Sequence, residues 1–382
     1  MKKFSQGLWL TFTFLSMVAL GFNDNLRGPL FFDILQDFKL TDLQGAWFYS
    51  AASITGFFAS LACAPLLKKM NLLQLLILSL LCMAFSLLGI GYFKDFHLFL
   101  MAAAGFGVSL GLMGVAQNSA IPFLTTPEGQ TRAYSAMHAL YGFSSVLAPM
   151  VVGWGVLRGW AWREFFTASG VFVLILFLLT LWAPQPLWAR EHRTAPQPEK
   201  NSLKELGWGA VIISFSLGFY VMTEIMVGSR LSLYTIRELG LTTAQASRYV
   251  TGFYLCLLAG RLLGVFFRWP GSIRNHLTVS LATSFLALIA GLYLNPWWFA
   301  FSGLTMSIFY PTFMVYLSGL YKARMGVMMS LVMAIQSLAI VMMHEVIGYL
   351  SDTEGIRVAF HAGLVFIALS LLALWKGHRV EA

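Results

Sequence analysis

The sequence predicts an all-α membrane protein with twelve transmembrane helices in two pseudo-symmetric bundles of six. Of its 382 residues, 58% are hydrophobic and only 11% are charged, whereas soluble domains carry about 25% charged residues. Apolar runs of about 20 residues, the length needed to cross a bilayer, recur along the chain. One polar stretch divides these runs into two groups of six, so we expect two membrane bundles and no soluble core.

The polar stretch is PQPLWAREHRTAPQPEKNSLKE, whose Pro, Arg, Glu and Lys content is typical of a solvated linker. We therefore expect bundles over 1–184 and 206–382 and a linker over 185–205. The apolar runs of the first bundle are 7–30, 46–66, 72–92, 97–121, 132–156 and 165–183. Those of the second are 206–234, 246–268, 276–294, 297–320, 326–349 and 357–375.

The first run lies behind Lys2 and Lys3, as the apolar core of a signal peptide does. No small-residue cleavage site follows it, and a polar cluster does. We therefore expect it to be kept as the first helix. The three cysteines (Cys63, Cys82 and Cys256) fall inside predicted helices without metal-type spacing, which favours packing roles.

Basic residues fall at the termini and in alternate loops, which predicts the orientation because positively charged loops stay in the cytoplasm. Both termini and the linker are thus expected in the cytoplasm, with the chain in a bacterial inner membrane. The same topology explains the formal net charge of +9 without a nucleic-acid partner. The basic residues on this side are Lys2, Lys3, Lys68, Lys69, Arg132, Arg190, Arg193, Lys200, Lys204, Arg268, Arg274, Lys322, Arg324, Lys376 and Arg379.

The end of the first run, ALGFNDNLRGPLFFDIL, gathers four polar side chains within five positions. A charge in mid-bilayer costs about 2.5–3.5 kcal/mol, so it needs a partner or a watery cavity. We interpret Asn23 and Asn25 as solute ligands, Asp24 as a cation-coupling group and Arg27 as a gating contact. The alternative is a fixed Asp24–Arg27 ion pair at the outer surface. Gly28-Pro29 is expected to break or bend this helix.

Later helices carry isolated ionisable residues. Glu224 is interpreted as a second coupling group, with a buried pair to Arg230 or Arg261 as the alternative. Arg261 itself fits a gating or structural contact. His138 has a titration range suited to moving protons, although a lone helical His is often only a packing residue. Adjacent His344 and Glu345 point to different sides of their helix, and Glu345 is the gating candidate.

Amide and phenol side chains in apolar helices are the candidates for binding a solute. They are able both to donate and to accept hydrogen bonds, which suits a ring of hydroxyls. The alternative is bonding between helices. These candidates are Gln117, Asn118, Tyr141, Tyr310 and Gln336.

Weak internal similarity supports two related halves. Asp24 and Glu224 lie 200 positions apart, and GLMGVAQNSAIPF is echoed by GLTMSIFYPTF. Internal repeats of this kind are common in transporters. The chain lacks the phosphate loop, the metal-spaced cluster and the nucleophile elbow that would suggest an ATPase or another enzyme. We therefore expect no enzymatic activity and no cofactor.

Twelve helices in two halves with a basic linker resemble the major facilitator superfamily along the whole chain. MHALYGFSSVLAPMVVGW resembles the fifth helix of the fucose:proton symporter family, and YVMTEIMVGSRLSLYTIRELG resembles its seventh. The superfamily signature between the second and third helices is eroded here to ACAPLLKKMN. The resemblance implies the major facilitator fold, monomers and alternating access. It also implies symport of a sugar or similar small polar solute with H⁺, with Na⁺ as the alternative ion.

A second interpretation stays open from the same helix. GFSSVLAPMVVGW also resembles the fifth-helix motif of facilitator exporters, although Ala148 replaces a glycine of that motif. This resemblance implies a proton-driven efflux antiporter for amphipathic drugs or lipids.

The predicted orientation is testable by labelling at Ala195, in the linker. A single cysteine placed there in a cysteine-free background should resist an impermeant thiol reagent added to intact cells and react after the cells are opened, because the linker is expected inside. Ready labelling in intact cells would reverse the orientation.

Overall fold

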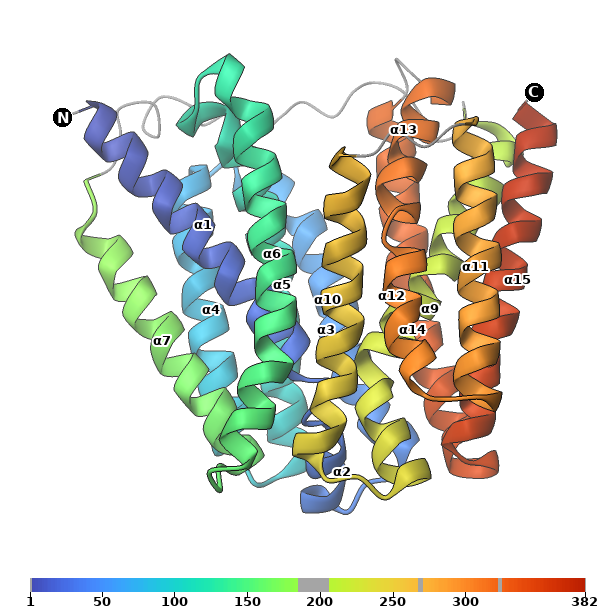
Figure 1. Ribbon diagram of the computed structural model, residues 1–382. Helices are drawn as coiled ribbons and strands as arrows, with labels where there is room; N and C mark the ends of the chain where they lie inside the picture. The colour runs from blue at the N-terminus through green and yellow to red at the C-terminus, as the bar shows by residue number, and fades with distance from the viewer. Residues whose placement is uncertain (1, 185–205, 267–270, 322–324, 382) are drawn as a thin grey trace. The chain divides into compact units, whose positions relative to one another are not determined.

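The computed structural model describes residues 2–184, 206–266, 271–321 and 325–381 (Figure 1). In these ranges the chain forms fourteen helices and no strand, which confirms the all-α class. Within the described residues, eleven helical segments are long and apolar enough to cross a membrane, and one of them, Trp297–Tyr321, comprises two of the fourteen helices. The predicted linker 185–205 lies outside the described residues.

Contacts divide the chain into two units. Unit 1 comprises Met1–Leu26, Trp47–Ala148 and Gly155–Gln197, and unit 2 comprises Arg27–Ala46, Pro149–Trp154 and Pro198–Ala382. Segment 27–46 therefore packs with the second half of the chain, although it belongs to the first half in sequence. The helices of the first half are α1 (Lys2–Leu26), α2 (Phe31–Phe38), α3 (Asp42–Leu66), α4 (Leu72–Tyr92), α5 (Phe96–Leu124), α6 (Pro127–Val156) and α7 (Trp162–Trp182).

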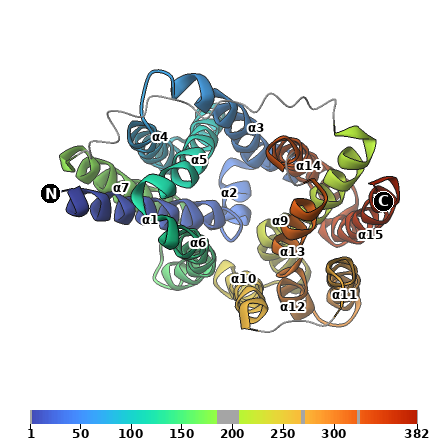
Figure 2. The same cartoon turned by 90° about the horizontal axis from the view of Figure 1, so that it is seen from above.

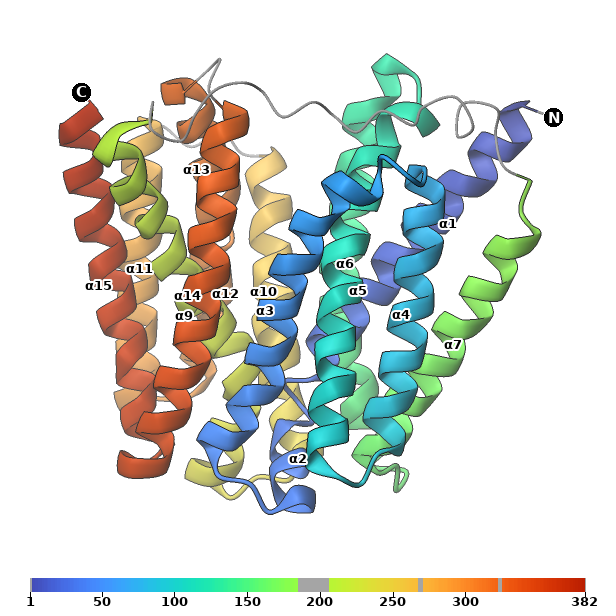
Figure 3. The ribbon, with the colours of Figure 1, turned by 180° about the vertical axis from the view of Figure 1, so that it is seen from behind.

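The helices of the second half follow after the linker. They are α9 (Gly207–Leu239), α10 (Thr243–Phe266), α11 (Ile273–Tyr293), α12 (Trp297–Met306), α13 (Phe309–Tyr321), α14 (Met325–Glu354) and α15 (Ile356–Glu381). Within unit 2, α9 packs against both α14 and α15 (Figures 1 and 3). Within unit 1, α4 packs against both α5 and α7 (Figure 2).

Short polar motifs set several helix ends. At α4, Asn71 and Gln74 form a capping box, in which each side chain bonds the other residue's backbone N–H at 2.9 Å. At α5 the Asp95 carboxylate accepts from the Leu98 N–H at 3.0 Å. α9 ends at Gly240, whose φ of +66° glycine adopts without strain.

Prolines break two of the predicted spans. The first run, predicted over 7–30, ends at Leu26, because Pro29 has no N–H for the carbonyl four residues before it and its ring crowds that carbonyl. A short helix, α2, follows that the sequence did not predict. The tenth run, predicted over 297–320, is split at Ser307 and Ile308, four and three residues before Pro311, into α12 and α13. The expected break at Gly28-Pro29 is confirmed.

Close approach of α3 and α5 in unit 1 depends on glycine. A Cβ on Gly107 would fall inside the contact radius of the Ala52 carbonyl oxygen, and one on Gly56 would lie 2.9 Å from the Gly107 carbonyl oxygen. Small residues commonly permit such backbone contact between membrane helices. Thr55 closes the contact by donating a 2.7 Å hydrogen bond to the Ala104 carbonyl.

This packing predicts opposite effects of one substitution at two glycines of α5. Gly107→Ala should destabilise the protein by about 1–3 kcal/mol, since the added methyl overpacks a backbone contact. Gly114→Ala is the matched control because no atom lies within 4 Å of its Cβ position, so higher helix propensity should leave stability equal or slightly greater. Thermal unfolding in detergent measures both. Equal melting temperatures for the two variants would contradict the packing.

Candidate functional site

The polar end of α1 is held by three side chains of unit 1. Asn23 accepts a 2.6 Å hydrogen bond from Ser169 on α7, and Asn25 donates to Ser145 on α6 at 2.9 Å. Between them, the Asp24 carboxylate accepts a 2.9 Å hydrogen bond from the Tyr141 hydroxyl, also on α6. Successive helical residues point about 100° apart, so this one turn of α1 reaches two neighbouring helices.

Burial separates the roles of these residues. Asn23 and Asn25 are 0% and 7% exposed, and each amide also donates to a carbonyl one turn back, Ala19 or Gly21, at 2.8 Å. In this structure their donors are thus engaged in packing, and their part in solute binding stays a prediction. Asp24 is partly exposed. It is the group of the three that is open to exchange with solvent or solute.

On α5 the two neighbouring amides have different surroundings. Gln117 is fully buried and its Nε2 donates to Ser16 at 2.8 Å, whereas its Oε1 accepts no hydrogen bond from the described residues. Asn118 is exposed, and its Nδ2 donates to the Gly114 carbonyl at 2.8 Å. The Asn118 side-chain oxygen is therefore the better placed of the two for a ligand. Tyr134 donates to the Asn118 backbone carbonyl at 2.7 Å.

His138 lies on α6 one turn before Tyr141 and is exposed. It therefore sits on the same helix as the hydrogen-bond donor of Asp24, and its role in proton movement stays a prediction.

Glu224 on α9 forms an ion pair in unit 2. Its Oε1 lies 3.5 Å from Arg261 Nη2 on α10, which is one of the two pairings that the sequence left open. Tyr310 on α13 is close enough to interact electrostatically with both charges. The buried Tyr220 hydroxyl, one turn before Glu224, donates to the Met306 carbonyl at 2.8 Å. The side chains of Glu224 and Arg261 are 19% and 36% exposed. Neither charge of the pair is thus fully buried within the unit.

A second charged group of unit 2 was not anticipated from the sequence. Arg230, 1% exposed, lies 3.3 Å from His344 Nδ1 on α14, and its guanidinium stacks 3.9 Å from the Phe31 ring centre on α2. Arg27 is 8% exposed and is close enough to interact electrostatically with His344. Arg230 is therefore the buried arginine in contact with the imidazole, and Arg27 is a second buried cation of the same unit. The sequence does show Arg230 inside an apolar helix, which indicates a buried charge. It does not show which side chains contact that charge.

The remaining candidates lie on α14. Glu345 is partly exposed beside the buried His344, and Gln336 is partly exposed with a buried Oε1 that accepts no hydrogen bond from the described residues. The structure thus separates the adjacent pair, with His344 inside unit 2.

Segment 27–46 is tied to the rest of unit 2 by charges that the sequence analysis missed. Asp42, 1% exposed, accepts from Arg237 Nη1 and Nη2 at 2.5 and 2.7 Å and from the Ser351 hydroxyl. Asp352 accepts from the Asp42 and Leu43 backbone N–H groups at 2.7 and 2.9 Å. These residues stand at helix ends, where charges are usually solvated, so sequence gave no signal for the cluster.

A third tie uses Asp33 on α2. Its Oδ1 accepts a 3.0 Å hydrogen bond from the Thr243 hydroxyl at the start of α10. Burial raises the pKa of the Asp33 carboxyl, and the smaller opposing effect comes from this hydrogen bond.

Within the part of the chain that the structure describes, no group of three or more His, Cys, Asp or Glu side chains is placed to hold a metal ion. The candidate side chains offer hydrogen bonds, two carboxylates and buried cations. Such a set is suited to reversible binding of protons and polar solutes.

Comparisons with known proteins agree on one family. The profile of the Major Facilitator Superfamily matches residues 13–344. A curated relative, the cis,cis-muconate transport protein of Acinetobacter baylyi, is 20% identical over 270 residues. That match covers 67% of this chain and 64% of the relative, so the chain spans less than two thirds of that protein's length.

Solved structures of low sequence identity share the fold. A bacterial homolog of the human lysosomal transporter Spinster, inward-facing and occupied, has a TM-score of 0.78 at 15% identity, covering 98% of this chain and 97% of that one. The D-xylose–proton symporter has 0.78 at 15%, with 99% and 97% covered. The Escherichia coli fucose:proton symporter has 0.64 at 18%, with 98% and 99% covered.

The partly buried carboxyl of Asp33 predicts a pH-dependent stability. With its pKa raised above the ordinary 3.8, the folded state holds this proton more tightly than the unfolded state. Stability is thus lost as the pH rises from the unfolded value through the folded one. Asp33→Asn removes the charge and keeps an acceptor for Thr243, so it should raise the melting temperature at about pH 7.5 and have little effect at about pH 3.5.

The matched control is Asp37→Asn, an exposed position on the same helix, which should show no such gain. A lower melting temperature for Asp33→Asn than for the unsubstituted protein at neutral pH would show that the ionised carboxylate stabilises the segment.

Proposed function

This chain belongs to the Major Facilitator Superfamily and is an integral membrane transporter rather than an enzyme. We propose that it couples the movement of a small polar solute to a proton gradient. The observation that carries the proposal is Asp24. It is a partly exposed carboxylate near the end of a membrane helix, and a single phenol, that of Tyr141, donates to it at 2.9 Å. A carboxylate there binds a proton from one side and releases it to the other by alternating access.

Glu224 supplies a second titratable carboxylate for this cycle. Its partner Arg261 is 3.5 Å away, and both side chains are partly exposed. Protonation of Glu224 would release Arg261, and solute binding near Tyr310 would favour one of the two arrangements. This exchange of partners links the proton to the solute without a cofactor. Na⁺ is the alternative ion.

A hydroxylated solute such as a sugar is the class that we propose first. Asn118 and Tyr141 in unit 1, and Tyr310 and Gln336 in unit 2, are amides and phenols that are partly or fully exposed. Such groups recognise hydroxyls by donating and accepting at once. Two proteins of the same fold are named as fucose and D-xylose symporters with protons, which supports this class.

A small carboxylate is the second candidate solute. The supporting observation is the group formed by Arg27, Arg230 and His344, which concentrates positive charge within the buried part of unit 2. Arginine is the side chain best suited to bind a carboxylate with two parallel hydrogen bonds. The curated relative is named as a transporter of cis,cis-muconate, a dicarboxylate.

The setting of the transporter follows from its charges. We propose that the chain acts as a monomer in a bacterial inner membrane with both termini in the cytoplasm, and its alternate basic loops support this orientation. The proton gradient across that membrane then drives the solute inward.

Uptake by purified protein in liposomes tests the coupling. Asp24→Asn should reduce solute accumulation driven by an inward proton gradient at least tenfold, while exchange of labelled for unlabelled solute persists, because exchange needs no net proton release. D-xylose, L-fucose and cis,cis-muconate are the solutes offered first, so that sugar and carboxylate classes are compared directly.

Asp37→Asn is the control, since it removes one carboxylate from an exposed position outside the spans, and it should leave both activities intact. If Asp24→Asn accumulates solute normally, Asp24 is not the coupling group. If the unsubstituted protein accumulates none of the solutes under proton or sodium gradients and instead extrudes a lipophilic dye, the antiporter interpretation replaces the symporter.

A further inference from the structure

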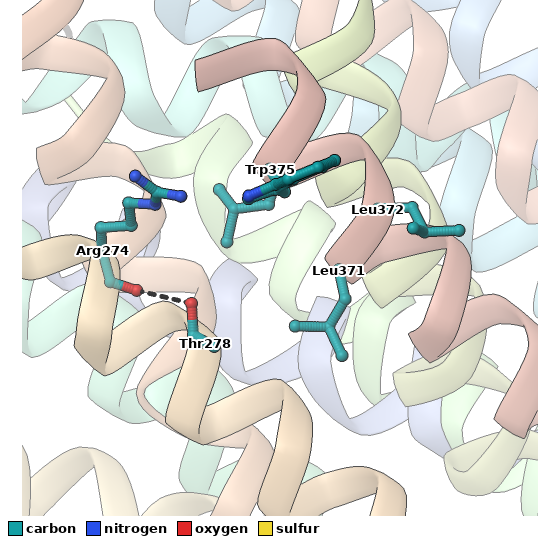
Figure 4. Close-up of a pocket in the computed structure, with 6 residues that line it drawn as sticks. Arg274, Thr278, Leu371, Leu372 and Trp375 are labelled. Atoms are coloured by element: carbon teal, nitrogen blue, oxygen red, sulfur yellow. Dashed lines mark hydrogen bonds between the residues drawn. The ribbon is translucent and has the colours of Figure 1, made fainter. Parts of the chain in front are cut away.

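A small cavity opens between α11 and α15 in unit 2, away from the residues considered above (Figure 4). Its volume is about 290 Å³, at the lower end of small-molecule pockets. Arg274 and Thr278 line it from α11, and Leu371, Leu372, Leu374 and Trp375 line it from α15. It lies near the start of α11 and the end of α15, the end of the unit where basic residues predict the cytoplasm.

The cavity faces outward from the unit. Leu372 and Trp375 are 52% and 43% exposed. An exposed Trp near a helix end is typical of the membrane–water interface. Whatever occupies the cavity therefore enters from the lipid side.

The one charged side chain that lines the cavity is Arg274. Within the described part of the chain, its guanidinium makes no hydrogen bond or ion pair, and its backbone carbonyl accepts from Thr278 at 3.0 Å. Lys376 lies one turn beyond Leu372 on the same face of α15 and adds a second positive charge. The polar rim is thus cationic, and an anionic occupant complements it.

Apolar side chains continue away from this rim along both helices. On α11, Phe285 is seven residues from Thr278, and on α15, Val365 is seven residues from Leu372, so each lies on the same side of its helix as that lining residue. Phe285 is partly exposed and Val365 is 56% exposed. Ala282 and Ala368, halfway along, add little bulk between the helices. A charged rim followed by an apolar track matches a lipid headgroup followed by its acyl chains.

We propose that this cavity binds the headgroup phosphate of an anionic phospholipid, with Arg274 as the principal ligand and the Trp375 indole beside it. Guanidinium groups bind phosphate oxygens through two parallel hydrogen bonds, and basic pockets between membrane helices are suited to anionic headgroups. The acyl chains lie along Leu372, Val365 and Phe285. The site is separate from the proposed solute pathway and does not depend on which solute is carried.

Native mass spectrometry of the detergent-purified full chain tests this site with phosphatidylglycerol and, for comparison, zwitterionic phosphatidylcholine. Arg274→Gln should weaken binding of the first phosphatidylglycerol about five- to tenfold, the effect of one well-placed charge, and leave phosphatidylcholine binding unchanged. Arg132→Gln is the matched control, because Arg132 is an exposed arginine of the same predicted membrane side, and it should have no such effect.

A second variant guards against a folding defect in the first. Thr278→Trp fills the cavity from an exposed position and should also displace phosphatidylglycerol while retaining Arg274. Equal losses for Arg274→Gln and Arg132→Gln, or binding retained in both cavity variants, would overturn the site. If millimolar inorganic phosphate raises the melting temperature as much as phosphatidylglycerol does, the cavity is a free-anion site and the lipid assignment fails.

Discussion

A membrane interior offers no water to backbone amides or charged side chains, so each needs a partner from the chain itself. Helices meet this need for the backbone, and short side chains extend it: Thr13, Ser214 and Ser247 each donate to the carbonyl one turn back. Between helices, Ser216 and Ser370 exchange hydrogen bonds of 2.9 and 2.7 Å with each other's backbone carbonyls. These bonds give polar side chains their hydrogen-bond partners within the chain, so the helices can lie in an apolar membrane interior.

The same constraint explains why the candidate residues are not all alike. Asn23 and Asn25 are buried and their donors are engaged, so they hold α1 to α6 and α7. Asp24, one position from each, is partly exposed and accepts a hydrogen bond from the Tyr141 hydroxyl. A group that changes protonation during transport needs access to water, and a group that only holds helices together does not. Partial exposure thus separates Asp24 from the two buried asparagines beside it.

Sequence reasoning located the spans because hydropathy over about 20 residues is a local property. It located the break after Leu26 for the same reason, since Pro29 acts within four residues. The sequence did not predict α2, because eight residues after a proline are too few to show a helical period. The sequence did not predict the Asp42–Arg237 pair, because the two residues are 195 positions apart. Each also lies at a helix end, where a charge is usually solvated. At Glu224 the sequence narrowed the partner to two arginines, and only tertiary packing chose Arg261.

The boundary between the two units falls between Leu26 and Arg27, inside the polar cluster that first marked the sequence. On one side, Tyr141 and Ser145 hold Asp24 and Asn25 to unit 1. On the other, Gly28 lies against α9 so closely that a Cβ would be 2.8 Å from the Gly228 carbonyl oxygen, and Ser232 donates to the Pro29 carbonyl at 3.3 Å. Three peptide bonds separate Asp24 from Arg27. The polar cluster thus serves both units: its first three side chains bond within unit 1, and the residues from Arg27 onward pack within unit 2.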